Sequence, residues 1–168
     1  ILVKSSGNLR RHIEVFIKLH ILNRSIVSKA CVRKMNINVE IKDAASVILI
    51  RNKKSNPSVL MGQRGRDAAF MPNKFVFPGG AVEDDDFQIK SFRQLNATCK
   101  ARMAYQCCED LVLALTLAAV RELFEETGII VGIKEKWTEI IPSKWKQFAD
   151  LGFVPDASNF QFVFRAIT

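Results

Sequence analysis

The stretch DLVLALTLAAVRELFEETG, residues 110–128, is the most strongly patterned segment of this 168-residue chain. It is rich in Leu, Ala and Glu, which favour helices, and Gly128 suits a helix C-terminal cap. We therefore predict one long helix here. Its first part is apolar on all sides and should be buried, whereas its last turn carries Glu122, Glu125 and Glu126.

The spacing of these three glutamates puts their side chains on one face of the predicted helix. Like charges repel one another there, and the helix dipole disfavours acids near a C-terminus. A bound divalent cation would offset this repulsion, and carboxylate oxygens are preferred ligands of Mg²⁺ and Mn²⁺. A solvated acidic helix end is the alternative interpretation, since a short acidic pattern alone is weakly specific.

Short apolar segments rich in β-branched residues lie before and after the long helix and predict strands. They cover residues 44–52, 58–64, 74–77, 129–133 and 160–168. A short helix is predicted over 143–152, and residues 86–95 and 98–111 are interpreted as helices or irregular structure. This order of elements predicts the α/β (α+β) class with a mixed sheet.

The basic net charge of +8 is concentrated at the start of the chain. Residues 1–34 hold eight Lys or Arg against one acid, whereas residues 35–168 hold seventeen against sixteen. A nearly neutral body does not suit nucleic-acid binding, and no apolar run is long enough for a membrane span.

Both histidines lie in residues 1–34, so we expect no zinc site in the body. The four cysteines favour reduced thiols in an intracellular protein.

Two segments are expected along the chain. Residues 1–34 are interpreted as a basic leader, either a targeting segment or sequence upstream of a start at Met35, without a defined structure. Residues 35–168 are predicted to form the folded domain, with an insertion at about 87–110.

The segment RELFEETGI, residues 121–129, resembles the second half of the Nudix box: Arg-Glu-aliphatic-x-Glu-Glu-x-Gly-aliphatic. The first half of that box is Gly, five residues, then Glu, which places Asp86 at the Glu position after Gly80. The two halves are separated by thirty-four residues in place of seven. One subgroup of Nudix hydrolases, among the peroxisomal CoA diphosphatases, carries such an insertion.

The segment before the box, residues 60–80, resembles the signature associated with CoA in that subgroup. Arg64 and the unit Phe77-Pro78-Gly79-Gly80 fall at the expected spacing. The second Arg and the Gly of the signature fall on Ala69 and Asn73, which weakens the indication of CoA specificity.

The resemblance implies a Nudix-type α/β/α sandwich with further strands beyond Thr168, so we expect the domain to be C-terminally truncated here. It implies a metal-dependent hydrolase of the diphosphate linkage in a nucleoside diphosphate derivative, with CoA or acyl-CoA as the first candidate. ADP-ribose, dinucleotide or nucleotide-sugar hydrolysis is the alternative, and a non-catalytic Nudix-like binding module is an alternative of another class. The expected partner is a small-molecule diphosphate, with no nucleic acid and no membrane. The expected location is the cytoplasm, with the peroxisome or mitochondrion as alternatives.

By the same resemblance, Glu122, Glu125 and Glu126 bind Mg²⁺ or Mn²⁺. Arg121 acts with Glu122 and Glu125 in catalysis and orients a carboxylate by charge-assisted hydrogen bonds. Gly79, Gly80 and Arg64 contact the substrate, the glycines by a close backbone turn and the arginine through phosphate.

Several other side chains are interpreted from the residues themselves. Asp86 is either a metal ligand or part of a solvated acidic loop or helix cap. Trp137 and Trp145 follow the box, and no pattern gives them a role. Four apolar residues before the box are predicted to belong to the core rather than to a substrate site, namely Met61, Phe70, Met71 and Phe75.

Overall fold

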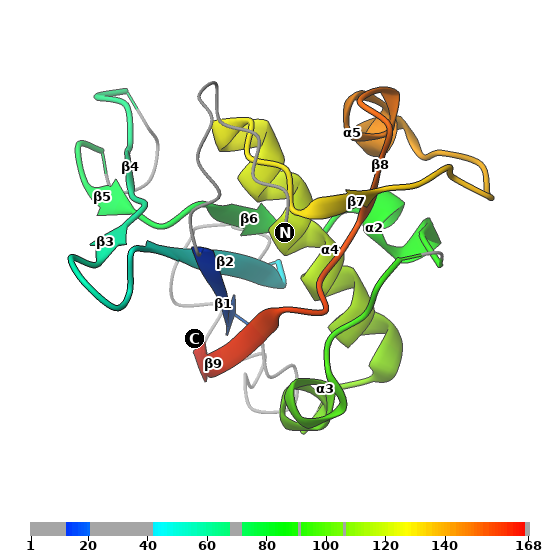
Figure 1. Ribbon diagram of the computed structural model, residues 1–168, viewed down its shortest axis with the longest axis horizontal. Coiled ribbons are helices and arrows are strands. Elements are labelled where there is room, and N and C mark those ends of the chain that lie inside the picture. The colour runs from blue at the N-terminus through cyan, green and yellow to red at the C-terminus, as the bar shows by residue number, and fades with distance from the viewer. Residues whose placement is uncertain (1–12, 21–41, 68–71, 91, 106, 167–168) are drawn as a thin grey trace, which may run out of the picture.

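The computed structural model describes residues 13–20, 42–67, 72–90, 92–105 and 107–166. These residues form a mixed sheet with several helices (Figure 1), which confirms the predicted class. The strands are β1 (Ile13–His20), β2 (Ala44–Arg51), β3 (Ser58–Val59), β4 (Gly62–Gln63), β5 (Phe75–Val76), β6 (Gly79–Ala81), β7 (Gly132–Lys134), β8 (Phe153–Pro155) and β9 (Phe160–Ala166). The helices are α2 (Asp84–Gln88), α3 (Ala97–Ala104), α4 (Glu109–Thr127), the 3₁₀ turn η1 (Ser143–Trp145) and α5 (Lys146–Asp150).

The main sheet has the strand order β3-β2-β1-β9, and β6 pairs with β2 as well. Strand β1 is antiparallel to β2 and parallel to β9, which makes the sheet mixed. Strands β4 and β5 form a separate antiparallel pair, and so do β7 and β8. The predicted strand over 58–64 is thus divided between the main sheet and the β4–β5 pair.

Strand β1 lies in the part of the chain expected to be an unstructured leader, and it occupies an interior place in the sheet between β2 and β9. Aliphatic residues recur at every second position from Ile13 to Leu19, which is the period of a strand rather than of a helix. Val15 is fully buried, and Glu14 forms an ion pair with Lys53 beyond β2. The interpretation of residues 13–20 as unstructured therefore differs from the structure. Residues 1–12 and 21–34 lie outside the described part.

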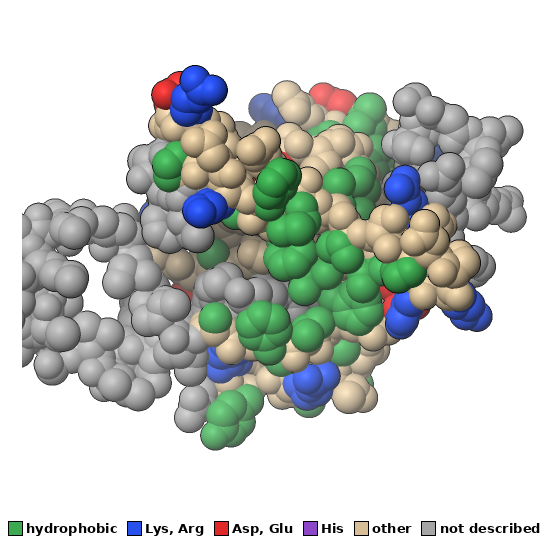
Figure 2. Space-filling view, turned by 90° about the vertical axis from the view of Figure 1, so that its left-hand side faces the viewer, with side chains coloured by type: hydrophobic (Ala, Val, Ile, Leu, Met, Phe, Trp, Pro, Cys, Tyr) green, Lys and Arg blue, Asp and Glu red, His purple; other side chains and the backbone are tan. Residues whose placement is uncertain are grey.

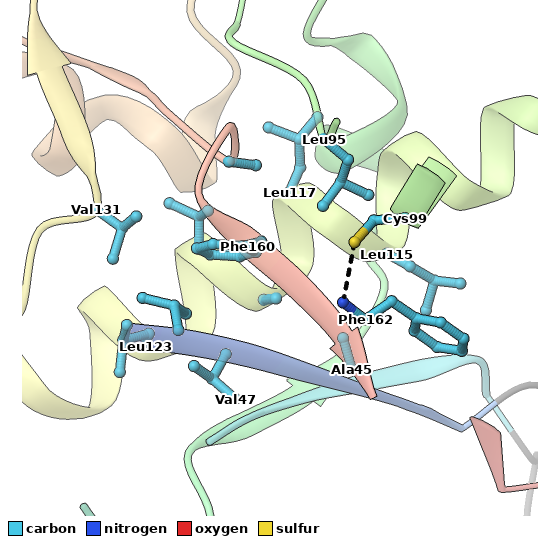
Figure 3. Packing of buried hydrophobic residues seen from close by; sticks show 14 of the residues in the cluster. Ala45, Val47, Leu95, Cys99, Leu115, Leu117, Leu123, Val131, Phe160 and Phe162 are labelled. Atoms are coloured by element: carbon cyan, nitrogen blue, oxygen red, sulfur yellow. Dashed lines mark hydrogen bonds between the residues drawn. The ribbon is translucent and has the colours of Figure 1, made fainter. Parts of the chain in front are cut away.

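Helix α4 confirms the predicted helix and packs against β2 and β6 (Figure 1). Gly128 is its C-cap in a left-handed conformation, with φ of 69°, and donates its amide to Phe124 O. The apolar part of the helix is buried, as expected, and its side chains form the core with β2 and β9 (Figure 3). Each such side chain removed from water stabilises the fold by about 1.5–3 kcal/mol.

The inserted segment supplies part of this core. Ile89, Leu95, Cys99 and Met103 are all buried. The Cys99 thiol accepts a hydrogen bond from the Phe162 amide nitrogen at 3.4 Å, which joins α3 to β9 (Figure 3). The insertion is therefore built into the domain rather than projecting from it.

The segment before β6 is more exposed than predicted. Met61 is 43% exposed and Phe75 is 66% exposed, so the prediction that both belong to the core is wrong. The β4 and β5 strands around them are two residues long and pair mainly with each other, which leaves their side chains without a covering layer among the described residues. Hydrophobic side chains gather on the face of the molecule that Figure 2 shows. Phe70 and Met71 lie outside the described residues.

Within the described ranges no single helix is long and apolar enough to cross a membrane. Helices α3 and α4 reach that length and composition only as a pair, with a bend of 114° between them.

Candidate active site

The two separated pieces of the predicted site meet where β6 lies against the last turns of α4. The Gly79 amide nitrogen donates to Glu126 Oε2 at 3.1 Å. Gly79 and Gly80 are predicted to allow a sharp turn and a close approach to the site; in place of a turn they form strand β6 and pair with Ser46 and Ala45 of β2, and the close approach is present. The thirty-four intervening residues thus leave the two halves in direct contact.

Both glycines are required by close approach rather than by a turn. Gly79 has φ of 150°, and a Cβ there would overlap the backbone of Ala45 and Ser46. A Cβ on Gly80 would lie within 2.6 Å of both carboxylate oxygens of Glu122. The pair therefore brings strand β6 against the sheet on one side and against the helix carboxylates on the other.

Arg121 is the centre of the charged network. Its side chain is 2% exposed and donates from Nε and Nη2 to the two oxygens of Asp86 at 3.0 and 2.9 Å. Its Nη1 donates to Glu122 Oε1 at 2.7 Å and to Glu125 Oε2 at 3.2 Å. Burial alone lowers the pKa of Arg121, but the hydrogen bonds and charge of Asp86 raise it well above its ordinary value. The guanidinium stays charged and holds two of the three predicted metal ligands.

Asp86 is an internal partner of Arg121. It is 1% exposed, and its carboxylate accepts from Arg121, from the Glu83 backbone N–H at 3.0 Å and from Trp145 Nε1 at 3.1 Å. Glu83 is the N-cap of α2, and Asp86, three residues later, completes a capping box with it, so Asp86 takes part in the helix cap. The solvated-loop interpretation is therefore wrong, and both carboxylate oxygens are already engaged by buried donors.

Three carboxylates lie near the end of α4, beside the single positive charge of Arg121. Burial raises the pKa of Glu122; Arg121 opposes this shift, and the negative charges of Glu125 and Glu126 add to it. A divalent cation would relieve this repulsion, so the donor chemistry fits the predicted metal. Among the described residues no three His, Cys, Asp or Glu side chains are gathered closely enough to hold a metal ion as they stand. The side chains are instead held by Arg121 and Gly79 N.

Within the described part of the chain, no hydrogen bond or ion pair joins Arg64 to the three glutamates. Its side chain is exposed next to β4, and its backbone N–H donates to Lys74 O at 3.0 Å. Trp145 is a site residue that the sequence does not predict; it is fully buried and donates to Asp86. No local pattern could have revealed it, because the contact spans fifty-nine residues.

Comparison with known proteins indicates the family to which the chain is related. The chain is 34% identical over 121 residues to a Caenorhabditis elegans protein whose name assigns it to the nudix hydrolases (nudix hydrolase 7). The match covers 71% of this chain and 32% of that protein. The chain is a relative of the Nudix hydrolases.

A second Nudix relative is the acyl-coenzyme A diphosphatase NUDT19 of Xenopus laevis, 30% identical over 110 residues. That match covers 52% of this chain and 28% of the relative. The chain thus spans about a third or less of the length of these Nudix proteins. No protein-family profile matches it, and no solved structure does.

Proposed function

We propose that this protein hydrolyses the diphosphate linkage of a nucleoside diphosphate derivative in a metal-dependent reaction, with CoA or acyl-CoA as the substrate class. The observation that carries the proposal is the arrangement at the end of α4. One buried guanidinium, paired with Asp86, holds Glu122 and Glu125 beside the strand whose amide binds Glu126. Carboxylates presented from a buried helix suit a metal site, because their backbone cannot shift.

In this proposal Glu122, Glu125 and Glu126 hold the cation, Mg²⁺ or Mn²⁺. When bound, such an ion neutralises the diphosphate and favours formation of the attacking hydroxide from water. Arg121 orients Glu122 and Glu125 through its hydrogen bonds. Water attacks one phosphorus, the bridging P–O bond breaks, and two phosphorylated products leave with the proton of the water released to a base or solvent.

The substrate class is supported by a relative and by the segment before β6. The Xenopus relative is named as an acyl-coenzyme A diphosphatase. Arg64 is exposed near the β4–β5 pair and is proposed to meet substrate phosphate. Cleavage of CoA at its diphosphate would give an adenosine nucleotide and a phosphopantetheine.

A substrate panel tests this proposal. The full-length protein is incubated with Mg²⁺ or Mn²⁺ and with CoA, an acyl-CoA, ADP-ribose, a dinucleotide or a nucleotide sugar, and the products are separated by chromatography. CoA and acyl-CoA are expected to give the highest kcat/KM, and a metal chelator is expected to abolish turnover. Preference for another diphosphate would overturn the substrate class while leaving the reaction intact.

The variant Glu126→Gln completes the test. Its side-chain oxygen can still accept from Gly79 N, but its charge is lost, so we expect a correctly folded protein with activity lower by at least about 10-fold. Glu109→Gln, at the other end of α4, is the matched control and should keep its activity. Absence of turnover on every substrate, with tight binding of one of them, would favour the binding-module alternative.

A further inference from the structure

The helical segment after the box is attached to the start of α2 by three hydrogen bonds. Ser143 Oγ and the Lys144 amide nitrogen donate to Asp85 Oδ2 at 2.9 and 2.8 Å. Trp145 Nε1 donates to Asp86 Oδ1 at 3.1 Å. Two adjacent carboxylates, Asp85 and Asp86, therefore connect η1 to the charged network of the candidate site.

The Asp86 carboxylate has a fixed orientation because each oxygen receives two donors. Oδ1 accepts from Arg121 Nε and Trp145 Nε1, and Oδ2 accepts from Arg121 Nη2 and the Glu83 amide. Arg121 binds along one edge of the carboxylate, while Trp145 and Glu83 support it from separate elements. Loss of the Trp145 donor would leave Oδ1 with Arg121 alone and remove one of the four donors that fix the carboxylate.

We propose that Trp145 is a positioning residue for the diphosphate hydrolysis, acting through Asp86 on Arg121. This inference rests on the proposed function. The guanidinium of Arg121 is planar and rigid, and its Nη2 also donates to Ala81 O at 2.9 Å, so a displacement of the Asp86 carboxylate would turn the group about that contact and shift Nη1. Nη1 is the atom that donates to Glu122 and Glu125. The indole N–H thus governs the placement of the two catalytic glutamates, which lie 23 and 20 residues earlier in the chain.

The packing of the indole ring is separable from its hydrogen bond. The Trp145 ring packs edge-on against Phe148, with centroids 5.4 Å apart, and lies 6.3 Å from the ring of Trp137. A phenylalanine at 145 would keep an aromatic ring at this position and remove the N–H together with the pyrrole part of the indole. Trp137 offers a matched comparison, since its own indole N–H donates to a backbone carbonyl, Phe153 O, at 2.8 Å.

The kinetic test compares Trp145→Phe with Trp137→Phe in the full-length protein. Each variant loses one indole hydrogen bond, but only that of Trp145 reaches the Arg121 network. We expect Trp145→Phe to lower kcat by about 10-fold or more with KM for the substrate nearly unchanged, and to raise the Mg²⁺ concentration for half-maximal activity. Trp137→Phe should keep kcat within about 2-fold of the wild type. Equal losses of kcat in the two variants, or an unchanged kcat in Trp145→Phe, would overturn the proposal.

A second measurement does not depend on turnover or on folding of Trp145→Phe. Mg²⁺ alone is added to the ¹⁵N-labelled protein, and the indole N–H signals of Trp137 and Trp145 are followed by NMR. Trp137→Phe identifies the Trp145 signal by removing the other. Because a cation at Glu122 and Glu125 competes with Arg121 Nη1 for their oxygens, the Trp145 signal is expected to shift while that of Trp137 stays in place.

The two measurements separate this inference from the proposed function. If the wild type hydrolyses a substrate and the Trp145 signal does not respond to Mg²⁺, the positioning role is overturned and the function stands. If the wild type hydrolyses nothing, the proposed function fails. A Mg²⁺-dependent Trp145 signal would then still support the connection to the glutamates, and a signal that does not move would overturn it.

Discussion

The Gly79 amide nitrogen donates to Glu126 Oε2 at 3.1 Å, joining strand β6 to the last turn of α4 across 47 residues of sequence. This bond lies beside the contact between Gly80 and the Glu122 carboxylate. The two glycines therefore meet different neighbours, since Gly79 faces the backbone of β2 and Gly80 faces a flexible side chain. A methyl group added at each should have different consequences.

Gly80→Ala should impair activity without unfolding the protein. Its Cβ would lie within 2.6 Å of both Glu122 carboxylate oxygens, so the carboxylate must move away from its place beside Arg121. We expect kcat to fall by about 10-fold and the thermal midpoint to change little. Gly62→Ala is the control, because a Cβ there meets nothing within 4 Å. Equal activities of the two variants would contradict this placement of Glu122.

Gly79→Ala should instead destabilise the fold. The added Cβ overlaps the backbone of Ala45 and Ser46, and alanine rarely adopts a φ of 150°. Since the backbone of a paired strand cannot move aside, we expect a loss of about 2–4 kcal/mol in the free energy of unfolding. Urea unfolding of Gly79→Ala and Gly80→Ala measures the difference directly. A Gly79→Ala protein as stable as Gly80→Ala would disagree with the described β2–β6 pairing.

The sequence predicted those parts of the fold whose signals are local. Helix α4 and its Gly128 cap follow from composition and a terminal glycine, and β2 follows from a run of aliphatic residues. Strand β1 differs from the sequence prediction because its apolar residues form no helical face; their alternation of period two is the signal of a strand.

For the candidate site, the sequence indicates the candidate residues but not the contacts between them. Glu122, Glu125 and Glu126 share one helix face by spacing alone, which the sequence shows. The sequence does not assign a single role to Asp86, because its partners Arg121 and Trp145 are distant in sequence. Contacts of this kind depend on how the elements pack, so no short sequence pattern indicates them.

Removal of residues 1–34 tests the place of β1. The shortened chain lacks an interior strand of the sheet and the fully buried Val15, and β2 and β9 lose their common partner. We expect it to show no cooperative unfolding transition by circular dichroism, whereas removal of residues 1–12 alone should preserve one. A cooperative transition of undiminished midpoint in the chain that begins at Met35 would support the leader interpretation instead.

Asp86→Asn should show how much the buried Asp86–Arg121 ion pair contributes to the free energy of unfolding. The variant keeps the size of the side chain but leaves the guanidinium of Arg121, which is 2% exposed, without its principal countercharge. Breaking a buried ion pair from one side costs about 3–5 kcal/mol. Denaturant unfolding measures this loss, and Asp84→Asn, an exposed aspartate of the same helix turn, is the control. A loss below about 1 kcal/mol would mean that Glu122 and Glu125 suffice to balance Arg121.

The contact of Asp85 with the start of η1 should make stability depend on pH in the acid range. The hydrogen bond from the Lys144 backbone N–H lowers the pKa of Asp85, burial opposes this, and the Ser143 hydroxyl adds to the lowering. The unfolded chain then binds a proton at a higher pH than the folded one does. The stabilisation is therefore complete above the ordinary carboxyl pKa of about 4 and is lost as pH falls through the lower folded value.

Asp85→Asn tests this dependence by thermal unfolding between neutral and strongly acid pH. At neutral pH the variant should be less stable by under about 1 kcal/mol, because the contact is partly exposed and screened by solvent. The difference from the wild type should shrink below about pH 4 as Asp85 becomes protonated. Asp84→Asn changes the charge of the same helix turn without touching η1, so it should not reproduce this profile. A difference that stays constant down to the lowest pH would show that the Asp85 charge does not hold η1 in place.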